Sequence, residues 1–297
     1  MIIEAWVVWT LLAALMQSVR TAGQKRLAGF VSPLTATLVR YLFGLPFALI
    51  YLAYLSLDSQ QQLPDPTYVF YLSGLAAGLL QILATVLLIR LVSLRNFAVG
   101  STLIRTEILL TALIGVTLFT EEISSIGWLA MLISVVGLIL ISVSRQSGFA
   151  SFWNRSAAYG LAAGLAFALT SLFLRQASLS LGLADAAHAA GITLVYMVLL
   201  QTVVCLGLVF WQKPEELKVL PERFAACTFI GVTSVMGSAG WFTAMTLQSA
   251  SYVKTLGQIE FLFTLGLSVF YFKERPNPTE LLGMGCIVVG SMLLLMF

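Results

Sequence analysis

The stretch EILLTALIGVTLFTE at residues 107–121 occurs a second time, in diverged form, as EFLFTLGLSVFYFKE at residues 260–274. One shift of 153 residues superimposes the glutamates at both ends of the two copies, and it also brings Gly137 onto Gly290. The two copies therefore read as one repeated unit of two helices joined by a turn. A carboxylate in hydrocarbon costs several kcal/mol and avoids lipid. Glu107 and Glu260 thus predict a polar cavity between two halves of a membrane protein.

The composition argues against a soluble protein. Hydrophobic residues make up 59% of the 297 residues and charged residues only 10%, whereas a soluble domain carries about 25% charged residues. The net charge of +3 is small and spread over loops, so it gives no support to nucleic-acid binding. The three cysteines lie in apolar segments without metal-ligand spacing, and no nucleotide-binding or hydrolase motif is present. We expect a multi-pass protein of the lipid bilayer with no enzyme activity, cofactor or metal.

Ten apolar runs are long enough to cross a bilayer, for which a helix needs about 20 residues. They cover residues 3–27, 33–57, 67–91, 96–119, 124–143, 157–180, 186–211, 222–247, 250–272 and 279–296. Five runs fall in each copy of the repeat, which assigns residues 1–148 to one five-helix unit and residues 149–297 to the other. Because the number per unit is odd, the second unit enters from the opposite face. The expected fold is all-α, with ten transmembrane helices in two inverted five-helix repeats, an architecture typical of transporters.

The distribution of basic residues predicts the orientation in the membrane. Lys and Arg gather in the loops that follow spans 1, 3, 5, 7 and 9, whereas the loops after spans 2, 4 and 8 contain neither. Short cytoplasmic loops carry the excess of Lys and Arg. We therefore expect cytoplasmic basic loops, outward-facing termini and a location in the plasma membrane, the inner membrane of a cell that has two.

Taken together, these features resemble the drug/metabolite transporter superfamily, and in particular its EamA-type members. The segments that carry the resemblance are Ser32-Pro33-Leu34 with Arg40, Glu107 to Glu121 with Gly137, and Glu260 to Glu274 with Gly290. The chain departs from the family pattern at Ile108 and Phe261, where the family often has proline, and at Thr120 and Lys273, where it often has glycine. The resemblance implies a ten-helix, alternating-access carrier for small metabolites.

Three arginines inside predicted spans of the first half have no basic counterpart in the second half. Arg20 aligns with Thr170, Arg105 with Gln258, and Arg40 falls near Thr193. A substrate is not two-fold symmetric, so groups that bind it are expected in one copy only. We therefore predict that Arg20, Arg40 and Arg105 bind an anion. The alternative, that these long side chains extend to the membrane interface, stays open.

Other polar residues complete the predicted site. Gln81, Trp241, Lys254 and Gln258 are candidate cavity residues because they lie within apolar spans, although Lys254 can also be read as an interfacial anchor. Glu107 and Glu260 occur in both copies. This symmetry favours a role in proton coupling or in bracing helices at the midplane, rather than in substrate recognition.

The leading hypothesis is a secondary carrier of a small anionic or zwitterionic metabolite, with protons as a candidate coupling ion. Guanidinium groups suit carboxylate and phosphate, and one of the glutamates would carry the proton or bind an amine. Two alternatives remain open. One is an exporter of lipophilic cations held by cation–π attraction, and the other is a non-transporting membrane scaffold or sensor.

Overall fold

The computed structural model describes residues 4–58, 65–92, 103–144, 155–263 and 277–296, and within these ranges the chain forms helices and no strands. The first half contains α1 (Ala5–Leu27), α2 (Pro33–Leu42), α3 (Leu45–Asp58), α4 (Tyr68–Val92), the 3-10 turn η1 (Ile104–Thr106), α6 (Glu107–Leu118) and α7 (Ser125–Ser144). The second half contains α8 (Arg155–Leu179), α9 (Ala186–Gln212), η2 (Pro214–Lys218), α10 (Val219–Glu222), α11 (Phe224–Leu247), α12 (Ala250–Leu256), η3 (Gly257–Ile259) and α14 (Pro278–Met296).

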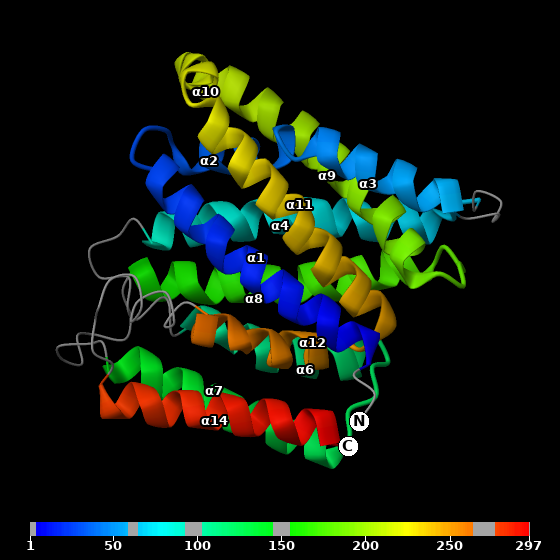
Figure 1. The fold of residues 1–297 in the computed structure, drawn as a ribbon, viewed down its shortest axis with the longest axis vertical. Helices are drawn as coiled ribbons and strands as arrows, with labels where there is room; N and C mark the ends of the chain where they lie inside the picture. Colours follow the sequence, from blue (N-terminus) through cyan, green and yellow to red (C-terminus); the bar gives the residue numbers. More distant parts are fainter. Residues whose placement is uncertain (1–3, 59–64, 93–102, 145–154, 264–276, 297) are drawn as a thin grey trace.

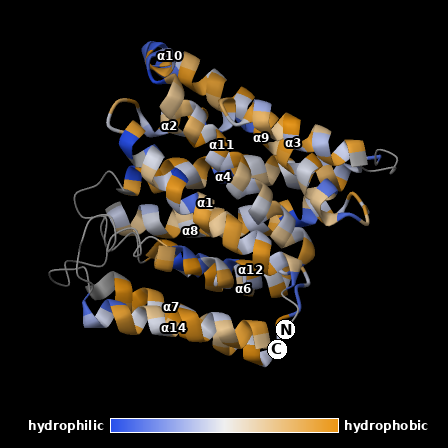
Figure 2. Ribbon diagram, in the orientation of Figure 1, coloured by the Kyte–Doolittle hydropathy of each residue, from blue (hydrophilic) through white to orange (hydrophobic). Residues whose placement is uncertain are grey.

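The outer surfaces of the helices are apolar, as a lipid environment requires. Ile50, Val203, Phe210 and Leu282 expose 64%, 71%, 70% and 67% of their surface, and hydrophobic residues run along α7 and α14 in Figure 2. Exposed apolar surface on this scale marks contact with a membrane or with other proteins, and helices long and apolar enough to cross a bilayer favour the membrane. The chain is thus a multi-pass membrane protein.

Helix length and apolarity identify fewer spans than the sequence predicts. Six helical segments in the described ranges satisfy both criteria, namely Pro33–Leu57, Tyr68–Leu91, Ser156–Leu179, Ala186–Gln212, Phe224–Leu247 and Pro278–Met296. A seventh apolar helix, Ser125–Ile141, is shorter. The remaining expected spans are not confirmed by this test, because α1 carries several polar side chains and α6 and α12 have only 12 and 7 residues.

Helices of the two halves interleave (Figure 1). The most extensive packing joins α4 to α8, α1 to α11 and α7 to α14, and α9 packs against both α2 and α3. If helices are matched in chain order, α1 corresponds to α8, α4 to α11 and α7 to α14. The α4–α8 contact then becomes the α11–α1 contact, and the α7–α14 contact becomes itself. The packing therefore follows an approximate two-fold symmetry that relates the two sequence repeats.

The repeated glycines lie where α7 crosses α14. A Cβ atom on Gly137 would collide with the carbonyl oxygen of Gly283, and one on Gly290 would lie 2.7 Å from the carbonyl oxygen of Ala130. The shift of 153 residues relates Ala130 to Gly283 and Gly137 to Gly290, so these are two copies of one contact. Small residues permit backbones to approach this closely in a membrane, which explains why both repeats have glycine here.

The segment predicted as one second span is broken in its middle. Ser32 caps the N-terminus of α2 and Pro33 occupies the first turn, where proline costs no hydrogen bond. The helix is interrupted at residues 43–44, because Pro46 has no N–H to donate to the carbonyl four residues earlier. Arg40 lies one turn before this break, and its side chain is buried.

Candidate functional site

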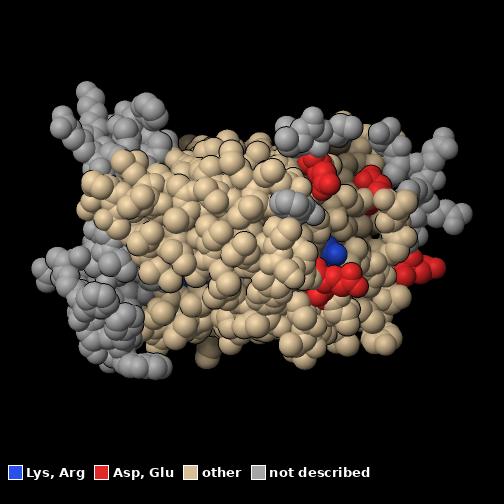
Figure 3. Space-filling model, turned by 90° about the horizontal axis from the view of Figure 1, so that it is seen from below, with Lys and Arg blue, Asp and Glu red and all other residues tan. Residues whose placement is uncertain are grey.

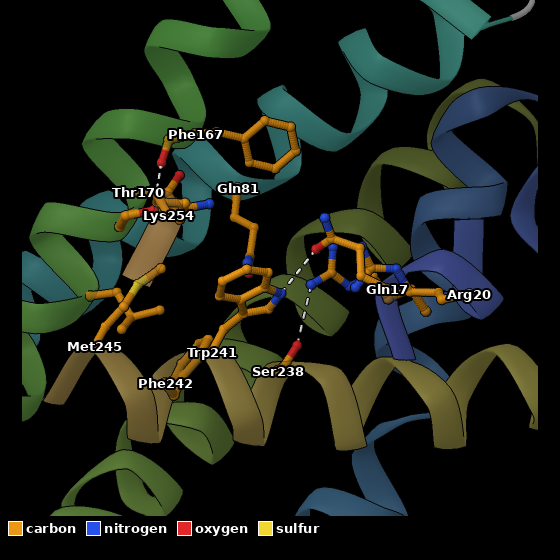
Figure 4. A pocket seen from close by; sticks show the side chains of 13 residues that line it. Gln17, Arg20, Gln81, Phe167, Thr170, Ser238, Trp241, Phe242, Met245 and Lys254 are labelled. Atoms are coloured by element: carbon orange, nitrogen blue, oxygen red, sulfur yellow. Dashed lines mark hydrogen bonds between the residues drawn. The ribbon is translucent and has the colours of Figure 1, made fainter. Parts of the chain in front are cut away.

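A small cavity lies between helices of the two halves, lined by α1, α2 and α4 on one side and by α8, α11 and α12 on the other. Figure 4 shows Arg20 and Lys254 entering from opposite sides, with Gln81 and Trp241 between them. The cavity volume is about 40 Å³, which holds about three water molecules. A metabolite can enter only if the surrounding helices move apart.

Two of the cations that line the cavity are arginines, and each is only 5% exposed. Arg40 donates hydrogen bonds to the hydroxyls of Thr85 and Ser238, both at 3.3 Å. Arg20 is less satisfied, because within the described part of the chain neither its Nε nor its Nη1 has a hydrogen-bond acceptor. Buried donors of this kind are costly unless a partner is supplied. The arginine side of the cavity is therefore suited to an anion.

Lys254 is the third cation of the lining, and it joins the two repeats. Its Nζ forms an ion pair with Oε1 of Glu107, and the two side chains are 15% and 14% exposed. The ammonium also lies 5.2 Å from the ring centre of Trp241 and 5.7 Å from that of Phe167. Lys254 thus occupies the aromatic faces of this part of the cavity, where a cationic ligand would otherwise bind.

The second glutamate also contacts the opposite repeat, here through a neutral amide. The amide nitrogen of Gln17 donates to Oε2 of Glu260 at 2.7 Å, and its amide oxygen accepts from the indole nitrogen of Trp241 at 3.0 Å. The largest charge interaction of Glu260 is with Arg105, whose guanidinium carbon lies 4.2 Å from the ring centre of Phe261. Each glutamate therefore faces a cation of the other repeat.

Both glutamates also follow the same backbone irregularity. The turn η1 directly precedes Glu107, η3 directly precedes Glu260, and the shift of 153 residues places one turn on the other. A short 3-10 stretch inside a helix often marks a hinge. The sequence repeat thus extends to the local backbone next to the two glutamates.

The structure brings some of the predicted site residues together and separates others. Arg20, Arg40, Gln81, Trp241 and Lys254 line the cavity. The other four do not line it, and they are Arg105, Gln258, Glu107 and Glu260.

These four residues form a layer behind the lining. Glu107 reaches the cavity through Lys254, and Glu260 reaches it through Gln17. The side-chain nitrogen of Gln258 donates to the backbone carbonyl of Lys254 at 3.0 Å, so Gln258 supports its own helix.

Sequence reasoning missed Gln17 and Gln201. Gln17 lies three residues before Arg20, a spacing that places both side chains on one helix face. Gln201 is 1% exposed and donates to the amide oxygen of Gln81 at 2.7 Å. It lines a second space of about 10 Å³ that shares Arg40, Gln81 and Ser238 with the main cavity. A lone amide in the apolar run of α9 was the available signal.

Glu121 and Arg175 fasten the α11–α12 corner at one end of the molecule. Glu121 is 8% exposed and accepts hydrogen bonds from the backbone nitrogen of Ala250 at 2.8 Å and from the hydroxyl of Ser251 at 2.9 Å. The Nε of Arg175 lies 3.4 Å from the same carboxylate. The ion pair therefore holds the N-terminus of α12 against the turn that follows α6.

Glu216 of η2 makes a corresponding contact at the other end, where α2 begins. The backbone nitrogen and hydroxyl of Ser32 donate to its carboxylate at 2.9 and 2.7 Å, and the hydroxyl of Thr35 donates to it as well. Burial alone would raise the pKa of Glu216, but these hydrogen bonds outweigh burial and hold the pKa below its ordinary range. The loop between α9 and α11 is thereby tied to the start of α2.

The comparisons with known proteins agree with this architecture. A sequence model described as the EamA-like transporter family matches residues 4–143 and again residues 154–296. Among 28 matching chains of solved structures is one named "Crystal structure of protein", which has a TM-score of 0.74 and 15% identity and covers 98% of both chains. No curated protein sequence matches the chain. The resemblance found in the sequence is thus confirmed, and the chain belongs to the EamA-like transporter family, whose repeated unit it contains twice.

Proposed function

We propose that this protein is a secondary transporter that moves a small anionic or zwitterionic metabolite across the plasma membrane by alternating access. The observation that carries the proposal is the charge of the cavity between the two halves. Three cations line it, and no carboxylate is among the lining residues that the structure describes. Guanidinium groups are suited to carboxylate and phosphate, and the unsatisfied donors of Arg20 are available to such a group.

The proposed architecture has ten membrane spans in two inverted five-helix repeats, residues 1–148 and 149–297. Three features support it: the symmetric helix pairing, the paired glycines of α7 and α14, and the matched 3-10 turns. Transporters built from inverted repeats bind substrate near the midplane at the repeat interface. The cavity lies between the two halves, since both contribute to its lining, which supports this location for the substrate site.

The charge distribution supports cytoplasmic basic loops and outward-facing termini. Figure 3 shows Asp and Glu side chains gathered at one end of the molecule, the end at which α1 begins and α14 ends in Figure 1. At the opposite end, the described end of α1 carries Arg26 and the described segment between α9 and α11 carries Lys213 and Lys218, and short loops rich in Lys and Arg face the cytoplasm. Glu121 and Arg175 would then close the outer side of the cavity.

Alternating access requires the cavity to enlarge, and the structure offers places where this can begin. The helices that carry Glu107 and Glu260 each contain a 3-10 turn next to the glutamate. The ion pair of Glu107 with Lys254 links one of these helices to the cavity lining, and Gln17 links the other. Protons are the candidate coupling ion, because either glutamate lies one side chain away from the cavity.

The alternative of a lipophilic-cation exporter is weaker on electrostatic grounds. The three lining cations would repel such a substrate, and Lys254 already faces the rings of Trp241 and Phe167. A scaffold or sensor would have no need for buried arginines between its two halves.

The proposal is tested by a thermal-shift screen of the purified protein against metabolites of both charge signs. Anionic or zwitterionic compounds should raise the melting temperature of the wild type, because a ligand that binds only the folded state stabilises it. An Arg40→Gln variant that is folded should lose this response. Stabilisation by cations alone would contradict the proposal.

A further inference from the structure

We propose that the cavity takes a dianion, carried as a phosphate monoester or as two neighbouring carboxylates, with its negative charges on Arg20 and Arg40. This inference rests on the proposed function and narrows its substrate class. The proposed function allows monoanions, dianions and zwitterions as substrates, and this inference selects the dianions.

The charges of the side chains in and around the cavity do not sum to zero. Six of them lie together in the described residues: Arg20, Arg40, Arg105, Lys254, Glu107 and Glu260. Glu107 pairs with Lys254, and the strongest charge interaction of Glu260 is with Arg105. The two carboxylates thus offset two of the four cations. A net excess of two positive charges remains, and the two cations that are not the first charge partner of either glutamate, Arg20 and Arg40, both line the cavity.

The two remaining arginines repel each other across the cavity wall. Arg20 and Arg40 are each 5% exposed, and they lie close enough for the charge of Arg40 to act directly on Arg20. Arg40 donates to the neutral hydroxyls of Thr85 and Ser238 and lies 5.3 Å from the ring centre of Tyr41. Arg20 has two nitrogens without acceptors in the described residues. Glu260 also acts on Arg20, but more weakly than Arg40 does, so the two guanidinium groups together are not fully compensated, and uncompensated buried charge is strongly unfavourable. A monoanion offsets one guanidinium group, whereas a dianion offsets both.

The opposite part of the lining defines the rest of the ligand. Leu174, Trp241, Phe242 and Met245 present apolar surface to the same cavity, and the Trp241 ring is held in place by its hydrogen bond to Gln17. The ligand therefore combines a doubly charged group with a small apolar or aromatic body. A phosphate monoester meets this description, since it carries a charge of about −1.5 to −2 at pH 7 and three acceptor oxygens.

The test compares ligands of nearly equal shape that differ by one charge. Binding of phenyl phosphate and phenyl sulfate to the full-length purified protein is measured by calorimetry at neutral pH, together with malonate and its monomethyl ester. Phenyl phosphate should bind at least about 30-fold more tightly than phenyl sulfate, the factor that loss of a buried charge partner typically produces. A preference for malonate over its monoester, with no phosphate preference, would assign the two charges to carboxylates.

Each outcome has a distinct meaning. If the singly and doubly charged members of both pairs bind equally well, the proposal of a dianionic ligand is wrong, but the proposed function is not contradicted. Failure of all four probes to bind also overturns the dianion. If lipophilic cations bind in their place, the proposed function fails too.

Variants give a second, independent readout. In Arg20→Gln the preference for phosphate over sulfate should fall about tenfold or more, while sulfate binding changes less, because only one positive charge remains in excess. Arg26→Gln is the matched control, since Arg26 is exposed on the same helix, and it should keep the wild-type preference. A folded Arg20→Gln protein with an unchanged preference overturns the inference. If Arg20→Gln does not fold, Arg40→Gln is judged by the same criterion.

Discussion

Replacing Lys254 by glutamine should destabilise the protein, because it leaves the carboxylate of Glu107 in the membrane interior without its cation. The two side chains are 15% and 14% exposed and their charged atoms are in direct contact. Removing one partner of a buried ion pair costs about 3–5 kcal/mol. For a chain of this size the melting temperature falls about 2 °C per kcal/mol, so we expect a decrease of about 6–10 °C.

The assay is thermal unfolding of the full-length protein in detergent, followed by intrinsic tryptophan fluorescence. The double variant Lys254→Gln/Glu107→Gln should recover at least half of the lost stability, since it removes the uncompensated charge together with its partner. Lys213→Gln is a suitable control, because Lys213 and Glu215 form an exposed ion pair at 4.0 Å of the kind that contributes little. If the single and double variants melt at the same temperature, the pair does not couple the two repeats and the reasoning is refuted.

Three further predictions concern packing, the loop that ends α9, and proton coupling. Gly290→Leu should destabilise the protein by about 3 kcal/mol or more through overpacking against α7, whereas Gly285→Leu should be tolerated because, among the described residues and apart from its own turn of helix, no atom lies within 4 Å of its Cβ position; circular dichroism melts of both variants check this. The pKa of Glu216 is lowered on folding, so wild-type protein should be more stable than Glu216→Gln above a pH of about 4.5, and melting curves should show this difference vanish as the pH falls through the folded-state pKa. Glu107→Gln or Glu260→Gln should abolish transport driven by a proton gradient while retaining substrate exchange at equal pH; full gradient-driven transport in both variants would leave the glutamates a structural role.

Much of the architecture could be predicted from particular residues. The glutamates and glycines of the 153-residue repeat indicated two related halves, and the family match confirms that relationship. The arginines without a counterpart in the second repeat pointed to Arg20 and Arg40, both of which line the cavity. These predictions depend only on burial and symmetry. Apolar runs in the sequence indicate burial, and the internal repeat indicates symmetry.

The position of Arg105 could not be predicted in this way. Its location within η1 changes the helical phase, because a 3-10 helix rotates about 120° per residue and an α-helix about 100°. Three residues of 3-10 conformation therefore shift the following side chains by about 60°, and sequence periodicity does not reveal the shift. Arg105 consequently lies over Phe261 and interacts with Glu260, while Glu107 pairs with Lys254.

Hydropathy was a poorer guide for the helices that form the cavity. Gln17 and Arg20 lower the apolar character of α1, which is not among the helices identified by length and apolarity. Their side chains contact Glu260 and the cavity rather than lipid. Gln17 and Arg20 give the site its polar groups, and the same two residues lower the hydropathy of α1, so that hydropathy does not identify α1 as a membrane span.

The central claim, that the cavity between the two halves carries a small anion across the membrane, is tested most directly by counterflow in proteoliposomes. A radiolabelled anion that stabilises the purified protein is added outside vesicles that contain the same unlabelled compound. Wild-type protein should accumulate label transiently, whereas the Arg20→Gln/Arg40→Gln variant should not, although it inserts to the same level. Equal counterflow by wild type and double variant, or counterflow of lipophilic cations in its place, would contradict the account.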